Sequence, residues 1–147
     1  MSLLFRVRAR LCALPLAHVV EIMRPLPVEA IAEAPAGVLG VAVIRGEPVA
    51  VIDVAELLGN SAGAPAPEPF ARLVTVRVRE RTIALVVDRV VDVRSLPTES
   101  SRELPPLLRD ADEDVVGALG TLDAELLFVL RAARLVPQGL EETEVSR

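Results

Sequence analysis

The feature that most constrains this chain is an internal duplication. Residues 5–23 align without a gap on residues 76–94, and 8 of the 19 aligned positions are identical. The recurring residues are Arg6, Val7, Arg8, Arg10, Ala13, Leu14, Val19 and Val20, which return as Arg77, Val78, Arg79, Arg81, Ala84, Leu85, Val90 and Val91. A second match joins residues 40–58 to residues 117–136, with one extra residue near Leu122. Each copy spans roughly 55–65 residues, the size of a small β-barrel, so the chain predicts two similar modules.

Composition favours strands over helices. The chain has 147 residues, of which 52% are hydrophobic, and its mean hydropathy is +0.46. Valine occurs 23 times, whereas only three residues are aromatic. Apolar and charged residues alternate at the start of both copies, as they do from Phe5 to Leu11. Many short strands separated by regular turn residues predict a mainly all-β fold with one or two short helices.

The same patterns predict the domain organisation. The first repeat covers residues 3–60 approximately and the second residues 70–137, with strands possibly exchanged between the two modules. The Pro-rich stretch 60–69 is the expected linker, residues 95–114 form a second long loop, and residues 138–147 form a polar tail. Strands are expected at 38–44, 49–54, 74–79 and 82–87, with a short helix over 53–59.

Cysteine content and hydropathy predict a cytoplasmic protein. The apolar stretches, such as residues 38–44, are too short to span a bilayer, so no membrane insertion is expected. Arg6, Arg8 and Arg10 interrupt the N-terminal region before the apolar segment of a signal peptide could develop. The single cysteine cannot form an internal disulfide, which fits a reducing compartment.

Charge argues against nucleic acid as a partner. The net charge is −5, and all 16 basic residues are arginine. A chain with this charge and three aromatic residues has neither an excess of cations for phosphates nor a platform on which bases could stack.

Residues that could support catalysis or bind a metal have simpler explanations, so no catalytic residue, metal or cofactor is expected. His18 aligns with Arg89 and is expected at the surface or facing a partner, and Cys12 aligns with Ile83 and is expected to be a small buried hydrophobe. Without any lysine a phosphate-binding P-loop is impossible. The acidic series 110–114 lacks the glycine and glutamate of a calcium loop. Asp53 and Asp88 each follow a strand, where capping of a turn or helix explains them.

The most unusual polar residue is Arg45, which lies in an otherwise apolar stretch. One interpretation is a turn arginine that points to water. The other is an interface arginine, because the planar guanidinium group is enriched in contact surfaces. Glu21 is its plausible partner, because it also follows apolar strand residues in the first repeat.

The order of several motifs resembles the CheW family. These motifs are A-L-P-L-x-x-V-x-E-I-x-R over residues 13–24, P-x-x-V-x-G-V over 35–41, V-x-V-I-D-V-x-x-L-L over 49–58 and A-L-V-V-D-x-V-x-D-V over 84–93. The resemblance covers residues 3–136. The chain departs from the family pattern at Val43, where asparagine is usual, and at Arg131, where aspartate is expected.

The resemblance implies two SH3-like, five-stranded barrels packed together, without an active site. CheW-like proteins are adaptors that couple methyl-accepting chemoreceptors to the histidine kinase CheA, in arrays at the cytoplasmic side of the membrane. Carried over by position, the partner-binding candidates are Val19, Glu21 and Arg45, with Ile83 and Ala84 as weaker ones. The alternative function is a small β-barrel that binds a small ligand or nucleic acid, and an enzyme is the third.

Overall fold

The computed structural model describes residues 1–59, 69–96, 101–102, 116–123 and 125–137. Nearly all of the expected linker 60–69, most of the loop 95–114 and the whole tail 138–147 therefore lie outside the described residues. In the described ranges, no helix is both long enough and apolar enough to cross a membrane.

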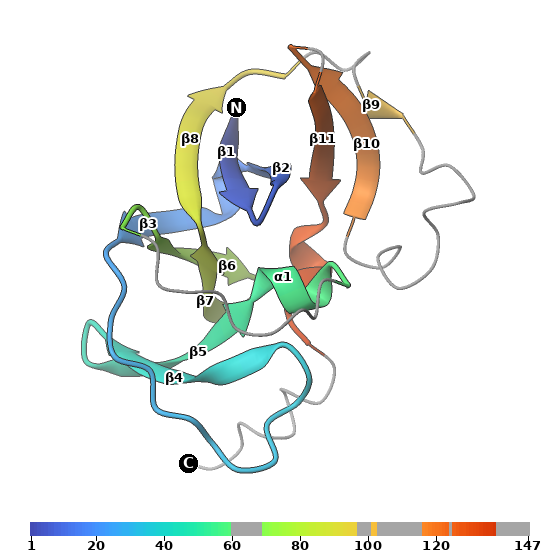
Figure 1. Cartoon of the computed structure of the whole chain (residues 1–147). Helices are drawn as coiled ribbons and strands as arrows, with labels where there is room; N and C mark the ends of the chain where they lie inside the picture. Colours follow the sequence, from blue (N-terminus) through green and yellow to red (C-terminus); the bar gives the residue numbers. More distant parts are fainter. Residues whose placement is uncertain (60–68, 97–100, 103–115, 124, 138–147) are drawn as a thin grey trace.

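Strands dominate the described chain, as the composition predicted (Figure 1). The strands are β1 (Ser2–Val7), β2 (Arg10–Pro15), β3 (Val19–Met23), β4 (Val38–Ile44), β5 (Glu47–Asp53), β6 (Arg72–Val78), β7 (Arg81–Val87), β8 (Arg89–Arg94), β9 (Ser101–Arg102), β10 (Val116–Leu122) and β11 (Glu125–Leu130). The helical turns are η1 (Leu16–His18), α1 (Val54–Leu57) and η4 (Ala132–Leu135).

The strands form two sheets, and each sheet combines strands from both repeats. One sheet has the order β8-β1-β2-β11-β10-β9, and the other has the order β3-β6-β7-β5-β4. The two SH3-like subdomains expected from the resemblance are thus present, one of them with a two-residue sixth strand, β9. In Figure 1 the first sheet forms the upper half of the molecule and the second forms the lower half.

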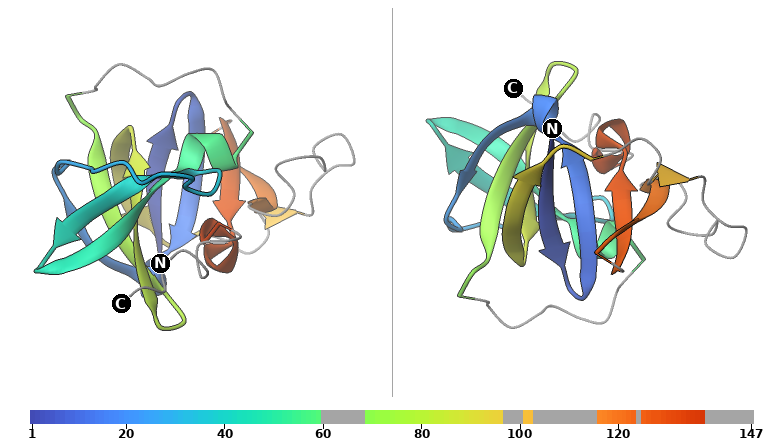
Figure 2. Two further views of the ribbon diagram at one scale, coloured as in Figure 1. Left: turned by 90° about the horizontal axis from the view of Figure 1, so that it is seen from below. Right: turned by 90° about the horizontal axis from the view of Figure 1, so that it is seen from above.

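Each repeat places its first hairpin in the sheet that holds the later strands of the other repeat. Hairpin β1–β2 lies between β8 and β11, and hairpin β6–β7 lies between β3 and β5. The junctions β2–β11 and β5–β7 are both parallel. Their registers are equivalent, because Phe128 pairs with Cys12 in one sheet and Ala50 pairs with Ile83 in the other. In Figure 2 the hairpin β1–β2 (blue) lies near the centre of the molecule, between β8 and β11.

Three apolar clusters follow from this arrangement. The largest lies between the sheets and draws side chains from both hairpins, including Phe5, Leu14, Val76 and Leu85, which are all fully buried. A smaller cluster lies on the other face of each sheet. Away from their turns, the two hairpins are therefore covered on both faces, and their sequences there are nearly continuously apolar; the predicted alternation is confined to the residues next to the turns.

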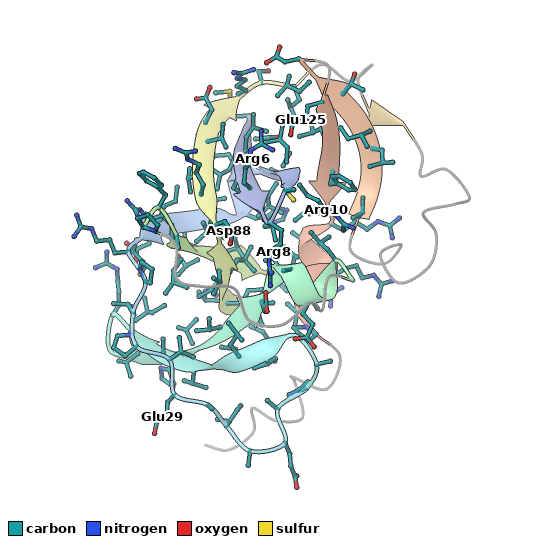
Figure 3. The ribbon with its side chains drawn as sticks, viewed as in Figure 1. Arg6, Arg8, Arg10, Glu29, Asp88 and Glu125 are labelled. Atoms are coloured by element: carbon teal, nitrogen blue, oxygen red, sulfur yellow. The ribbon has the colours of Figure 1, made fainter. Side chains whose placement is uncertain are left out.

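Polar contacts join the hairpin β1–β2 to segments that follow strands of the other sheet. Asp88, between β7 and β8, accepts a hydrogen bond from the Arg8 backbone N–H through Oδ2 at 2.6 Å, and its own N–H donates to the Arg6 carbonyl at 2.9 Å. Arg8 and Asp88 lie together near the middle of Figure 3. Arg10 Nη1 donates to the Leu58 carbonyl, at the end of α1, at 2.9 Å. The capping role expected for Asp88 is thus a turn cap that joins the two repeats.

The structure corrects the expected alignment of the later strands. Strand β4 has an irregularity between Val38 and Gly40 in its pairing with β5, and β10 has the same irregularity between Val116 and Ala118 in its pairing with β11. Ala118, rather than Gly117, is therefore equivalent to Gly40, and no extra residue near Leu122 is needed. Glycine is required at position 40 because a Cβ there would lie 2.2 Å from the Glu29 carbonyl oxygen.

Because both sheets share the largest cluster, we expect the two repeats to unfold together. Phe5→Ala should lower the free energy of unfolding by about 3–5 kcal/mol, since it removes a fully buried ring from that cluster. Urea unfolding followed by far-UV circular dichroism should show one transition for both proteins, at a lower midpoint in the variant.

The matched control is Phe70→Ala. Phe70 is 54% exposed, and the Arg89 Cζ lies 4.7 Å from the centre of its ring. Removing this ring should therefore lower the free energy of unfolding by about 1 kcal/mol or less. Two separate transitions in the Phe5→Ala variant would contradict a shared core.

Candidate functional site: a partner-binding surface

Arg45 and Glu21 connect the two edge strands of the five-stranded sheet. Glu21 lies on β3, and Arg45 lies in the turn between β4 and β5 with a positive φ of 54°, followed by Gly46 at 81°. The Arg45 Nε donates to Glu21 Oε2 at 2.8 Å, and Nη2 donates to Oε1 at 2.7 Å. This is a bidentate pair, the strongest geometry for arginine and carboxylate. The partnership expected from the sequence is present, and we call this junction the first seam.

The first seam is partly exposed and electrostatically coupled. The Arg45 side chain is 77% exposed, whereas that of Glu21 is 26% exposed. The hydrogen bonds from Arg45 lower the pKa of the Glu21 carboxyl, and the same bonds raise the pKa of Arg45. In the described part of the chain, Arg45 Nη1 makes no hydrogen bond. The guanidinium can therefore hold Glu21 with one edge and offer further donors to a partner.

A β-bulge determines how β3 presents Glu21. Val19 pairs with Val76 and Glu21 pairs with Thr75, so Val20 is an extra residue on β3 with no partner on β6. The Thr75 hydroxyl accepts a hydrogen bond from the Glu21 N–H at 3.1 Å and donates one to the Glu21 carbonyl at 3.2 Å. Bulges re-aim side chains at sheet edges, and this one lies directly beside the carboxylate that binds Arg45.

Exposed apolar residues lie next to the first seam in the sequence. Val20 and Ile22, on either side of Glu21, are 55% and 42% exposed, and Val43, two residues before Arg45, is 69% exposed. Sequence reasoning did not select these three residues as candidates. The available signal was Val43, which replaces the asparagine usual in the family pattern. Apolar residues beside a bidentate ion pair are the composition of a protein-binding surface.

The other predicted site residues divide between surface and interior. Val19 is half-buried and packs against the margin of the large cluster between the sheets. Ile83 and Ala84 lie on β7, and both are fully buried, one in the large cluster and one in the smaller cluster of the five-stranded sheet. Their side chains therefore pack in the core and do not face a partner, because the hairpin β6–β7 is covered on both faces.

The second repeat has an equivalent seam with the charges rearranged. Asp92 on β8 stands where Glu21 stands on β3, and Asp123 in the β10–β11 turn stands where Arg45 does. The cation is Arg94, whose Nε lies 3.0 Å from Asp92 Oδ2 and whose Nη1 lies 3.5 Å from Asp123 Oδ2. The backbone positions are retained, but the hairpin tip is anionic here and cationic in the first repeat.

Asp53, His18 and Cys12 lie where the sequence predicted them. Asp53 caps α1, because its Oδ1 accepts a hydrogen bond from the Ala55 N–H at 3.1 Å. His18 lies half-buried at the surface, with Nδ1 3.4 Å from the Arg77 carbonyl oxygen. Cys12 is fully buried, and burial raises the pKa of its thiol to about 12. Among the described residues, no group of three or more His, Cys, Asp or Glu side chains could hold a metal ion, and residues 110–114 lie outside that part.

We expect the Glu21 carboxyl to titrate below its ordinary pKa of 4.5, and Arg45→Ala to return it toward that value. A depressed pKa means that the pair stabilises the fold above the unfolded-state pKa, and that this contribution is lost as pH falls through the folded-state value. NMR of the side-chain carboxyl carbons across about pH 2–7, roughly the range in which carboxyl groups titrate, would measure the pKa of Glu21 in the wild type and in Arg45→Ala.

The control is Glu125, on β11 of the six-stranded sheet. Hydrogen bonds from Arg6, on β1 of that same sheet, lower the pKa of the Glu125 carboxyl (Figure 3). Its titration should be the same in wild type and in Arg45→Ala. If the pKa of Glu21 were the same in Arg45→Ala as in the wild type, the result would contradict the pairing in solution.

We expect the Cys12 thiol to be unreactive in the folded protein. A fully buried thiol with a pKa of about 12 has almost no thiolate at neutral pH, and the thiolate is the nucleophile. Ellman's reagent should modify it only after denaturant is added, and rapid modification of the native protein would contradict the buried position.

Comparison with known proteins agrees with this architecture. A family model described as "CheW-like domain" matches residues 2–139. A probable chemotaxis protein CheW of Rhizobium etli is 27% identical over 133 residues, which cover 89% of this chain and 83% of that protein. A chemotaxis protein CheW of Rhizobium meliloti is 25% identical over 144 residues, which cover 97% and 89%.

A solved structure gives the fold independently. The crystal structure of the scaffolding protein TtCheW from Thermoanaerobacter tengcongensis superposes with a TM-score of 0.79, covers 92% of this chain and 90% of that one, and is 23% identical. The family match spans nearly all of the chain, including every element that forms the two sheets and both seams. The chain therefore belongs to the CheW-like domain family, whose members serve as chemotaxis scaffolds and adaptors rather than enzymes.

Proposed function

We propose that this chain couples the cytoplasmic tip of a methyl-accepting chemoreceptor to the regulatory domain of a CheA-type histidine kinase. The observation that carries the proposal is the first seam, a partly exposed bidentate ion pair on strands that also expose apolar side chains. The chain would act on the cytoplasmic side of the membrane, within receptor arrays.

The chemistry of the first seam suits a helical partner. Val20, Ile22 and Val43 offer apolar contact area, and such area can cover the apolar stripe of an amphipathic helix. The exposed Arg45 would add hydrogen bonds to carbonyl or carboxylate groups on the partner, so that the apolar contacts give affinity and the polar ones fix the register. Val19, at the margin of the core, would connect this surface to the interior.

A coupling protein must hold two partners at once, and the duplicated fold provides two surfaces that differ. The first seam exposes a cation at its hairpin tip, whereas the second exposes Asp123, which is 80% exposed. Two partners with different surfaces can therefore bind one molecule without competing. Binding would change kinase activity by favouring one arrangement of the kinase over another, because an adaptor without catalytic groups acts through differential affinity.

Arg45→Glu should abolish co-sedimentation with receptor-containing membranes and CheA-type kinase. The variant removes the bidentate pair and places a second carboxylate beside Glu21, but the exposed position of residue 45 should leave the thermal unfolding midpoint nearly unchanged. The measurement is co-sedimentation with and without kinase, together with a thermal melt of the purified protein.

Arg79→Glu is the matched control. Arg79 is also an exposed hairpin-turn arginine, with a positive φ of 60°, but it lies in the turn between β6 and β7. Arg79→Glu should bind receptor membranes and kinase like the wild type. A separate variant, Glu21→Arg combined with Arg45→Glu, tests whether these two residues act as a pair in binding. Unaltered binding by a folded Arg45→Glu variant would reject this surface, and retention of nucleic acid at moderate salt would favour a different function.

A further inference from the structure

Thr75 is the one buried polar side chain among the residues that the structure describes, and it is 1% exposed. It lies on β6, between Glu21 on β3 and Ala84 on β7. Its hydroxyl contacts a single residue, with the Glu21 N–H and the Glu21 carbonyl as its two partners. A buried hydroxyl is costly unless both its donor and its acceptor are used, and here both are used on the residue that holds Arg45.

The internal duplicate shows that the bulge does not need this hydroxyl. Strand β8 has the same bulge, at Val91, because Val90 pairs with Phe5 and Asp92 pairs with Leu4. Leu4 is the counterpart of Thr75, is 1% exposed and packs in an apolar cluster. The bulge therefore forms over an apolar side chain in one sheet and over a hydroxyl in the other.

The two bulges differ in what the acidic side chain does. Asp92 Oδ1 accepts a hydrogen bond from the next backbone N–H, that of Val93, at 2.8 Å, and Asp92 Oδ2 accepts one from Arg94 Nε at 3.0 Å, so only one of its carboxylate oxygens takes part in the ion pair. Glu21 has its backbone N–H held by Thr75 and directs both carboxylate oxygens to Arg45. The Thr75 hydroxyl thus fixes the backbone of Glu21, and both Glu21 carboxylate oxygens bind Arg45, whereas the bulge without a hydroxyl keeps one carboxylate oxygen of Asp92 on its own strand.

We infer that Thr75, contributed by the second repeat, is a positioning residue for the binding surface of the first repeat. It fixes the backbone of Glu21 within the bulge, so that Glu21 orients Arg45 toward a partner. The binding consequence rests on the proposed function, whereas the effect on Glu21 itself does not.

The test compares Thr75→Val, which keeps the shape and removes the hydroxyl, with Thr75→Ser, which keeps the hydroxyl. In Thr75→Val the Glu21 carboxyl should titrate closer to its ordinary pKa, and its amide should exchange with solvent faster than in wild type. Binding to receptor membranes should weaken by about five- to tenfold, the effect of one lost hydrogen-bonded contact. Thr75→Ser should restore all three readouts.

Thr82→Val is the matched control, because it removes a hydroxyl from the neighbouring strand β7, where Thr82 contacts Arg77 at 3.3 Å away from Glu21. It should change none of the readouts. If Thr75→Val does not fold, Thr75→Ala is measured in its place.

The outcomes separate the two ideas. The inference is overturned if Thr75→Val has the same Glu21 pKa and the same Glu21 amide exchange rate as the wild type, regardless of its affinity for receptor membranes. If both NMR readouts shift but neither Thr75→Val nor Arg45→Glu affects binding, Thr75 positions Glu21 as inferred, and the proposed partner surface is the part that fails.

Discussion

Each sheet of this protein is completed by a hairpin from the other half of the chain, and the rest of the structure depends on that exchange. The hairpins β1–β2 and β6–β7 are buried on both faces, one face in a sheet's own core and one in the core between the sheets. Neither repeat can form its sheet without the other, so the relative position of the two sheets is set by backbone pairing as well as by packing. A scaffold that must hold partners at a fixed geometry benefits from this rigidity.

Because the interior is built from doubly covered strands, the ion pairs of both seams lie on edge strands and turns. The apolar fraction of 52% follows from the same arrangement, since strands with two buried faces cannot alternate. The exposed pair of Glu21 and Arg45 is not needed to hold the core. Its residues are therefore free to change with the partner, and the second repeat shows such a change at the same backbone positions.

Much of this could be predicted from sequence, and the failures have a common cause. The duplication predicted two similar modules, the position of Asp53 after a strand predicted its helix cap, and the isolation of Arg45 in an apolar stretch predicted a pair with Glu21. Ile83 and Ala84 were misjudged because strand periodicity tells which residues share a face, but not that both faces are covered. The contact between Thr75 and Glu21 also depends on pairing between strands more than 50 residues apart, which no local pattern contains.

The retained backbone and rearranged charges of the two seams have one more consequence. The two repeats correspond in strand pairing, in the positions of their bulges and in the left-handed turn residues, since Arg45 and Asp123 have φ values of 54° and 53°. At that turn position one repeat has a guanidinium and the other has a carboxylate. The two repeats are thus similar in backbone and opposite in charge at their hairpin tips. A partner that recognises shape alone could bind the molecule in either of two directions, but a partner that also senses charge is left with one.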